Sequence, residues 1–139
     1  MRILVTGGAG YIGSHAVKLF LARGHDVWVY DNLVFGHRQA VPAERLVVAD
    51  LSETARLDQV MVERRIEAVV HFAAFAYVGE SVQHPAKYYQ NNLVNALNLP
   101  GGKPWRLDAD WASDVTFTAA GSGPATKVAL SFYPGYETA

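Results

Sequence analysis

A glycine-rich segment near the N-terminus constrains the fold of this chain more than any other feature of its sequence. The segment reads GGAGYIG at positions 7–13, between a short apolar run at 2–6 and a stretch of helical spacing. Gly7 permits a tight turn, Gly10 a close approach of backbone to a ligand, and Gly13 close packing of helix on strand. The first helical amides, including those of Tyr11 and Ile12, would then face an anion such as a phosphate.

Short apolar runs and amphipathic stretches alternate as far as residue 99. The sequence predicts strands at 2–6, 27–30, 46–49 and 68–72, and helices at 11–23, 52–65 and 80–99. Gly24 would end the first helix, Ser52 would cap the second, and Pro85 marks where the third would break. Apolar strands separated by helices are typical of a parallel sheet covered on both faces. We expect an α/β fold, a truncated Rossmann-like parallel sheet with flanking helices.

The composition changes at Pro100, and residues 100–139 are predicted to form a tail separate from the domain at 1–99. Residues 105–113 show no clear period, whereas 114–119 and 126–133 alternate as strands do, with the turn-like run GSGP at 121–124 between them. The tail is therefore expected to be a β-hairpin. An isolated hairpin is marginal in water, so it would pack on the sheet edge or on a partner chain.

The composition excludes several classes of protein. The chain has 139 residues, a net charge of -1, 12 Lys and Arg residues and no cysteine. It thus lacks the basic footprint of nucleic-acid binding, and it cannot form disulfides, thiolate metal sites or cysteine nucleophiles. Its histidines and acidic residues lack metal-ligand spacing, so no metal is predicted. No signal peptide and no apolar run of ~20 residues is evident, so we expect a cytoplasmic protein without a membrane partner.

An acidic residue ends the second predicted strand. Asp31 lies eighteen residues after Gly13, where the acid that binds a ribose is expected after a glycine-rich turn. A carboxylate there accepts hydrogen bonds from ribose hydroxyls and repels a 2′-phosphate. The two features together predict NAD(H) as the cofactor, in preference to NADP(H).

Several motifs within residues 1–99 resemble the cofactor half of the UDP-glucose (UDP-galactose) 4-epimerases, which are extended short-chain dehydrogenases/reductases. They are VTGGAGYIGSH at 5–15, DNL at 31–33, GHR at 36–38, GESV at 79–82, YY at 88–89 and NN at 91–92. The resemblance implies contacts with the adenosine ribose (Asp31, Asn32), with adenine (Asp50, Leu51), along the cofactor (Phe72, Ala73, Ala74) and from the third helix (Asn91). Some members carry a lysine that contacts the cofactor where this chain has Ala76. The loss of that lysine should weaken cofactor binding without abolishing it.

The chain departs from this family in its catalytic residues. The family uses a tyrosine four residues before a lysine, with a Ser or Thr from the next strand. No lysine of this chain, namely Lys18, Lys87, Lys103 or Lys127, follows a tyrosine at that spacing. The resemblance ends at Leu99, so the sugar-binding half has no counterpart in the sequence.

Tyr77, Ser81 and Tyr88, with Glu80, are the candidate proton donors that remain. They follow the fourth predicted strand, where ligands bind in open α/β sheets. The alternative for each is a structural residue. His71, at the end of that strand, is interpreted as a buried, hydrogen-bonded histidine and not as a catalyst.

Two functions stay open from the sequence. One is an NAD(H)-dependent oxidoreductase that reduces a small sugar-like or hydroxy-ketone carbonyl with loose specificity. The other is a non-catalytic dinucleotide-binding or interaction module, and UDP-sugar epimerisation ranks third. A sheet that ends at its fourth strand exposes an apolar edge, which pairs readily unless it is covered. Residues 114–119 could cover it within one chain or exchange between two, so we expect a homodimer.

Overall fold

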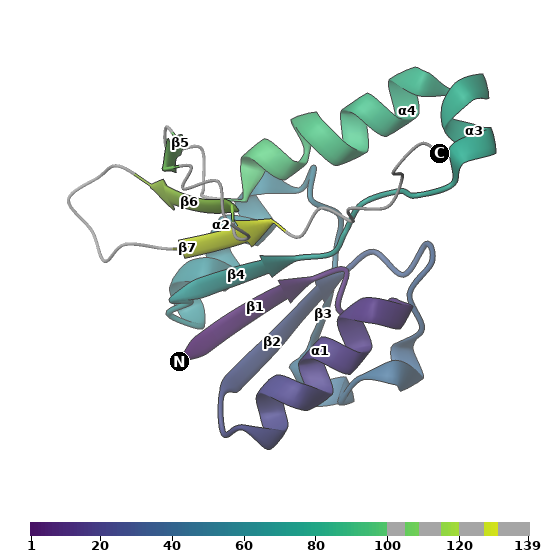
Figure 1. Ribbon diagram of the computed structural model, residues 1–139. Coiled ribbons are helices and arrows are strands. Elements are labelled where there is room, and N and C mark those ends of the chain that lie inside the picture. Colours follow the sequence, from purple (N-terminus) through teal and green to yellow (C-terminus); the bar gives the residue numbers. More distant parts are fainter. Residues whose placement is uncertain (100–104, 109–114, 120–126, 131–139) are drawn as a thin grey trace, which may run out of the picture.

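The computed structural model describes residues 1–99 and the backbone of residues 105–108, 115–119 and 127–130. The first four strands are β1 (Arg2–Thr6), β2 (Asp26–Asp31), β3 (Leu46–Val48) and β4 (Ala68–His71). The helices are α1 (Tyr11–Ala22), α2 (Thr54–Glu63), α3 (Val78–Gln83) and α4 (Pro85–Tyr89). Short helical turns are η1 (Arg38–Ala40), η2 (Ala43–Arg45), η3 (Gln90–Val94) and η4 (Ala96–Asn98). Figure 1 shows their arrangement.

The first four strands form a parallel sheet in the order β3-β2-β1-β4 (Figure 1). In the register, Thr6 pairs with both Tyr30 and His71, so the carboxyl ends of β1, β2 and β4 lie at one level. After β3 the chain crosses from one side of β1 to the other. Ligands of open α/β sheets bind at such a switch point, outside the carboxyl ends of the strands. The predicted α/β fold with a parallel sheet is confirmed.

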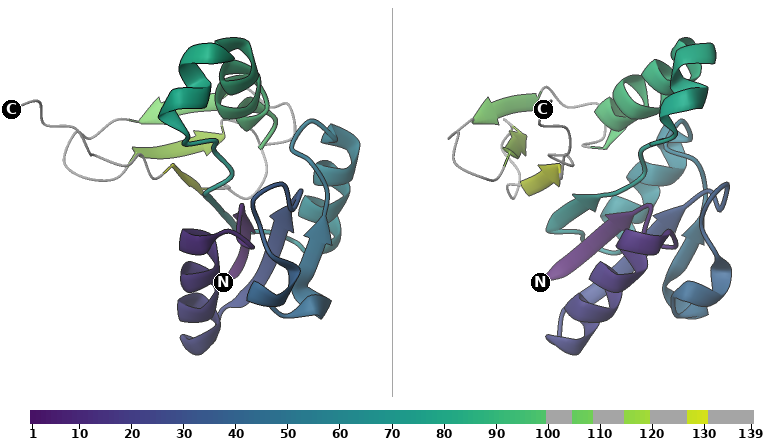
Figure 2. Two further views of the ribbon diagram at one scale, coloured as in Figure 1. Left: turned by 90° about the vertical axis from the view of Figure 1, so that its right-hand side faces the viewer. Right: turned by 45° about the vertical axis from the view of Figure 1, so that its right-hand side comes forward.

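The core has two layers because strand side chains alternate between the faces of the sheet. Helix α1 covers one face and α2 the other (Figure 2). The layer under α1 contains Ile3, Val5, Ala9, Val17, Val27, Val29 and Val41. The layer under α2 contains Leu4, Tyr30, Ala49, Leu51, Leu57, Val60, Ile66, Val69 and Leu99. This burial on both faces explains why β1 and β2 read as nearly continuous apolar runs.

Two of the three predicted helix-boundary features are confirmed and one is wrong. Gly24 follows α1 with a φ of 78°, the left-handed conformation that ends helices. Pro85 is the first residue of α4, and the helical segment is broken at His84. Ser52 does not cap α2, whose N-cap is Glu53. The Ser52 hydroxyl instead donates to the Asp50 carboxylate at 2.7 Å. Asp50 thus competes with the amides at the start of α2 for the Ser52 hydroxyl.

Beyond Leu99 the structure describes the backbone of three short strands, β5 (Trp105–Asp108), β6 (Val115–Ala119) and β7 (Lys127–Leu130). Strand β7 pairs parallel with β4, and β6 pairs antiparallel with β7 and with β5. The sequence did not predict β5, because four residues are too few to show a period. The edge of β4 is met by β7 and not by the predicted segment 114–119. The predicted turn at 121–124 lies outside the described residues, so the hairpin stays a prediction.

In the part of the chain that the structure describes, no helix is both long and apolar enough to cross a membrane.

Candidate functional site

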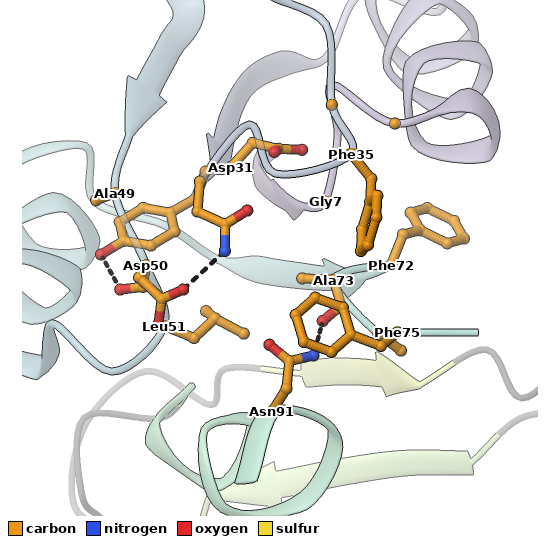
Figure 3. Close-up of a pocket in the computed structure, with 15 residues that line it drawn as sticks. Gly7, Asp31, Phe35, Ala49, Asp50, Leu51, Phe72, Ala73, Phe75 and Asn91 are labelled. Atoms are coloured by element: carbon orange, nitrogen blue, oxygen red, sulfur yellow. Dashed lines mark hydrogen bonds between the residues drawn. The ribbon is translucent and has the colours of Figure 1, made fainter. Parts of the chain in front are cut away.

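A pocket opens at the switch point, outside the carboxyl ends of β1, β2, β3 and β4 (Figure 3). The predicted cofactor-binding residues that line it are Gly7, Gly10, Asp31, Asn32, Asp50, Leu51, Phe72, Ala73, Ala74 and Asn91. Five further lining residues were not predicted, namely Tyr30, Phe35, Gly36, Ala49 and Phe75. Residues from four separate loops therefore meet at one place.

Two glycines of the glycine-rich turn meet backbone too closely to carry a side chain, Gly7 against the segment after β4 and Gly13 within the turn itself. A Cβ on Gly7, which has a φ of 68°, would lie 2.5 Å from the Phe72 carbonyl carbon. A Cβ on Gly13 would lie 2.2 Å from the Gly7 carbonyl oxygen. A Cβ on Gly10 would lie 3.3 Å from that same oxygen. Gly7 and Gly13 thus serve the packing of the turn, and Gly7 and Gly10 line the pocket.

Helix α1 begins at Tyr11, with Gly10 as an N-cap that has no side chain to bind the free amides. The amides of Tyr11, Ile12 and Gly13 have no acceptor within the helix, whose first internal bond is donated by Ser14 to Gly10 at 2.9 Å. The side chains of Tyr11 and Ile12 are exposed and do not line the pocket. Any role of these two residues in binding an anion therefore belongs to their backbone amides.

Asp31 is held by the turn that it faces. Its side chain is buried, with a residue exposure of 6%. One carboxylate oxygen accepts the Ala9 amide at 2.9 Å, and the other accepts the Leu33 amide at 2.8 Å. A carboxylate offers about four lone-pair positions, so two remain for a ligand in the pocket. The carboxylate is therefore pre-positioned to accept further hydrogen bonds at the pocket wall.

Asn32 and Asp50 join the loops after β2 and β3. The Asn32 side-chain amide donates to the Asp50 carboxylate at 2.7 Å, and the Ser52 amide donates to the same group at 2.9 Å. Burial alone would raise the pKa of Asp50, but these bonds outweigh it and hold that pKa below its ordinary value. The Tyr30 hydroxyl donates to the Asp50 carbonyl at 3.1 Å. This side of the pocket is thus rigid and negatively charged.

Asparagines of the helical segment fix the loop after β4. The Asn91 side chain donates to the Ala73 carbonyl at 3.1 Å. The Asn92 side chain accepts the Phe75 amide at 2.8 Å and donates to the Phe75 carbonyl at 2.9 Å, as a strand partner would. The segment from Phe72 to Phe75 is therefore held extended along the pocket.

The three candidate proton donors lie outside the pocket lining. The Tyr88 hydroxyl donates to Glu80 at 2.8 Å, and the Ser81 hydroxyl donates to the Val78 carbonyl at 2.7 Å. Burial and the contact with Glu80 raise the pKa of Tyr88, which weakens it as an acid. Tyr77 is exposed and its ring packs on Phe35, a residue of the lining. The ring of Tyr88 packs likewise on Phe75, another residue of the lining, but its hydroxyl is already bonded to Glu80.

His71 is buried, and its Nδ1 lies 2.7 Å from the Thr6 hydroxyl. Burial lowers the pKa of His71 to about 4, so its ring is neutral at neutral pH. This arrangement agrees with the interpretation of His71 as a structural residue that joins β4 to β1.

The lining residues that sequence reasoning missed differ in the signal they leave. Tyr30 and Ala49 sit at predicted strand ends, and Gly36 begins the GHR motif, so each neighbours a predicted feature. A Cβ on Gly36 would lie 2.6 Å from an Asp31 carboxylate oxygen, which explains the glycine. Phe35 and Phe75 leave no comparable signal, because an aromatic residue in a loop has no period.

Comparison with known proteins gives the family. Residues 3–100 match the NAD dependent epimerase/dehydratase family. A UDP-glucose 4-epimerase from Lactobacillus helveticus is 46% identical over 100 residues, which is 71% of this chain and 30% of that protein. The chain therefore spans about a third of the length of that relative.

Solved structures show the same likeness. The UDP-glucose 4-epimerase of Brucella ovis in complex with NAD has a TM-score of 0.68 and 50% identity, over 70% of this chain and 30% of that one. The Thermus thermophilus enzyme in complex with NAD has a TM-score of 0.69 and 45% identity, over 71% of this chain and 32% of that one. The family match over residues 3–100 includes the four parallel strands from Ile3 onward and the residues that line the pocket. The chain belongs to the NAD-dependent epimerase/dehydratase family, as the motifs in residues 1–99 predicted.

Proposed function

We propose that this chain binds NAD(H) in the pocket at the switch point. The observation that carries the proposal is the buried Asp31 carboxylate, which the Ala9 amide of the glycine-rich turn fixes at 2.9 Å. A dinucleotide needs a close backbone approach for its phosphates and an acceptor for its ribose hydroxyls. Gly10 and Asp31 provide these two features in one pocket.

The residues present fit this cofactor. The free amides at the start of α1 suit the pyrophosphate, and Asp31 with Asn32 suits the adenosine ribose. Ala49 and Leu51 offer apolar contact for a base beside Asp50, and Asn91 supports the segment that would run along the cofactor. The Asp31 carboxylate would repel a 2′-phosphate, so NADH should bind more tightly than NADPH. Relatives solved with NAD support the same choice.

A second candidate function is reduction of a small sugar-like or hydroxy-ketone carbonyl with loose specificity. Bound NADH would supply the hydride. Tyr77, an exposed residue whose ring contacts the pocket wall, favours this candidate. General acid-base assistance contributes about 10²–10⁴ in rate, so a chain without the family's tyrosine–lysine pair should be slow. No conversion of UDP-glucose to UDP-galactose is expected.

Calorimetric titration tests the binding proposal. The parent chain should bind NADH more tightly than NADPH, and Asp31→Ala should narrow the difference because it removes the repelling charge. Equal or tighter binding of NADPH by the parent would contradict the role given to Asp31. Consumption of NADH with a panel of small carbonyls, with Gly10→Ala and Asp31→Ala as controls, then separates a slow reductase from a module that only binds.

A further inference from the structure

An aromatic contact beside the pocket joins two loops that lie on opposite sides of β1. The rings of Phe35 and Phe75 meet edge to face at 5.5 Å between centroids, and the rings of Phe35 and Tyr77 meet at 5.1 Å. Phe35 follows β2, whereas Phe75 and Tyr77 follow β4. Since β1 lies between β2 and β4, the contact bridges the end of β1, where the glycine-rich turn begins. We call these three residues the aromatic clasp.

The loop that carries Phe35 is fixed at both ends. The Leu33 amide donates to Asp31 at 2.8 Å, and the His37 amide donates to the Ala9 carbonyl at 2.9 Å. Leu33 has a φ of 60°, a conformation that costs a leucine energy and persists only where the surroundings hold it. The Phe35 ring is therefore presented over the pocket by a short loop with little freedom to retreat.

The other half of the clasp is also supported. Asn92 binds the Phe75 backbone, and the Phe75 ring meets the Tyr88 ring at 5.7 Å and the Lys87 ammonium at 5.0 Å. Phe35 and Phe75 both line the pocket, and Figure 3 shows them on one side of it, with Asp50 and Leu51 on the other. Tyr77 does not line the pocket, so its contact with Phe35 acts on the pocket only through that ring.

We propose that the aromatic clasp closes across the dinucleotide site and limits cofactor release, with Tyr77 as the positioning residue that holds Phe35 over the pocket. The proposal rests on the proposed function, binding of NAD(H). Phe35 is 45% exposed and Tyr77 is 58% exposed, so their mutual contact lies at the solvent side of the site, as a closing element must. On this proposal, a ligand beside Gly7 and Gly10 parts the Phe35 ring from its two partners when it leaves. The ring of Tyr77, and not its hydroxyl, makes the contact.

The test measures the NADH dissociation rate of the full chain in a stopped-flow experiment, with excess NAD⁺ to displace NADH. We expect Tyr77→Ala to raise the dissociation rate about 3- to 10-fold, the size of one aromatic pair. Tyr77→Phe keeps the ring and should release NADH near the parent rate. Tyr89→Ala, which removes a tyrosine of α4 that is 68% exposed and outside the pocket lining, is the matched control and should match the parent.

The outcomes separate the two proposals. Release from Tyr77→Ala at the parent rate overturns the clasp and leaves NAD(H) binding intact. Release from Tyr77→Phe as fast as from Tyr77→Ala also overturns it, because the ring alone should be sufficient. A parent chain that binds no NADH overturns the proposed function and the clasp with it. The melting temperatures of the same samples show whether a variant that releases NADH faster is still folded. A folded variant with faster release has an open site, whereas an early-melting one has lost its structure.

Discussion

The two glycines that flank the start of α1 give a matched pair of substitutions. In Gly13→Ala the new Cβ would lie 2.2 Å from the Gly7 carbonyl oxygen and 2.7 Å from the Gly8 Cα. Both neighbours are backbone, and the Gly10 amide donates to that Gly7 oxygen at 3.1 Å, so the turn cannot yield without losing its own hydrogen bond. In Gly10→Ala the new Cβ would lie 3.3 Å from the same oxygen, and the φ of -75° suits alanine.

The magnitudes follow from these distances. Overpacking costs about 1–3 kcal/mol and occasionally more, and a contact as short as that of Gly13→Ala belongs at the upper end. For a domain of this size, a loss of about 3 kcal/mol lowers the melting temperature by roughly 10 °C. Alanine in place of glycine at an N-cap costs about 1 kcal/mol or less, so Gly10→Ala should melt within a few degrees of the parent.

Thermal unfolding by circular dichroism and NADH calorimetry on the same proteins check the pair. Gly13→Ala should melt early. Gly10→Ala should stay folded but bind NADH about tenfold more weakly, the effect of ~1.4 kcal/mol, because the proposed function puts the phosphates against the Gly10 backbone, where the new methyl group would be. A Gly13→Ala protein with the parent melting temperature would refute the packing argument. A Gly10→Ala protein with parent affinity would refute the placement of the cofactor on the turn.

Two more predictions concern stability and assembly. Burial lowers the pKa of His71 from 6.5 to about 4, so the folded state favours the neutral ring. The contribution of neutral His71 to the free energy of unfolding is full above pH 6.5 and is lost as the pH falls from 6.5 towards 4. We expect a loss of about 2 kcal/mol between pH 7 and pH 5 in urea unfolding, and a flatter profile for His71→Gln; equal slopes for both proteins would exclude His71 as the cause. The chain is also predicted to be a homodimer, and light scattering that gives a monomer at every concentration would contradict this.

Local patterns in the sequence predict the part of the fold around the glycine-rich turn. The turn, the helix after it and Asp31 at the end of β2 lie within one short stretch, and each has a spacing that a single strand–turn–helix unit requires. Gly24 ends α1 because its own backbone adopts the left-handed conformation, with a φ of 78°. Ser52 shows where this reasoning fails, because a carboxylate two residues earlier accepts its amide and hydroxyl. The N-cap pattern considers Ser52 and the helix after it, and it does not consider whether the Asp50 side chain points back at Ser52.

Contacts between loops are less predictable because they depend on the order of strands. Phe35 and Phe75 are forty residues apart, and they meet only because β2 and β4 lie on either side of β1. Before that order is known, each is an isolated aromatic residue in a loop. The pairing of Asn92 with Phe75 is equally hard to predict. The Asn92 side chain bonds the Phe75 backbone as a neighbouring strand would, and no periodic pattern in the sequence indicates such a bond.

Two hypotheses concern Tyr77: its hydroxyl donates a proton to the substrate, or its ring holds Phe35 over the pocket. The substitution Tyr77→Phe separates them. If its hydroxyl donates a proton to a carbonyl substrate, Tyr77→Phe should slow NADH consumption and leave the rate of NADH release unchanged. If only its ring matters, Tyr77→Phe should change neither, whereas Tyr77→Ala should speed release. Tyr88→Phe is the comparison, because its hydroxyl is already bonded to Glu80 at 2.8 Å and its raised pKa makes it a poorer acid. A loss of turnover in Tyr88→Phe alone would place the proton donor on α4 and remove Tyr77 from the reaction.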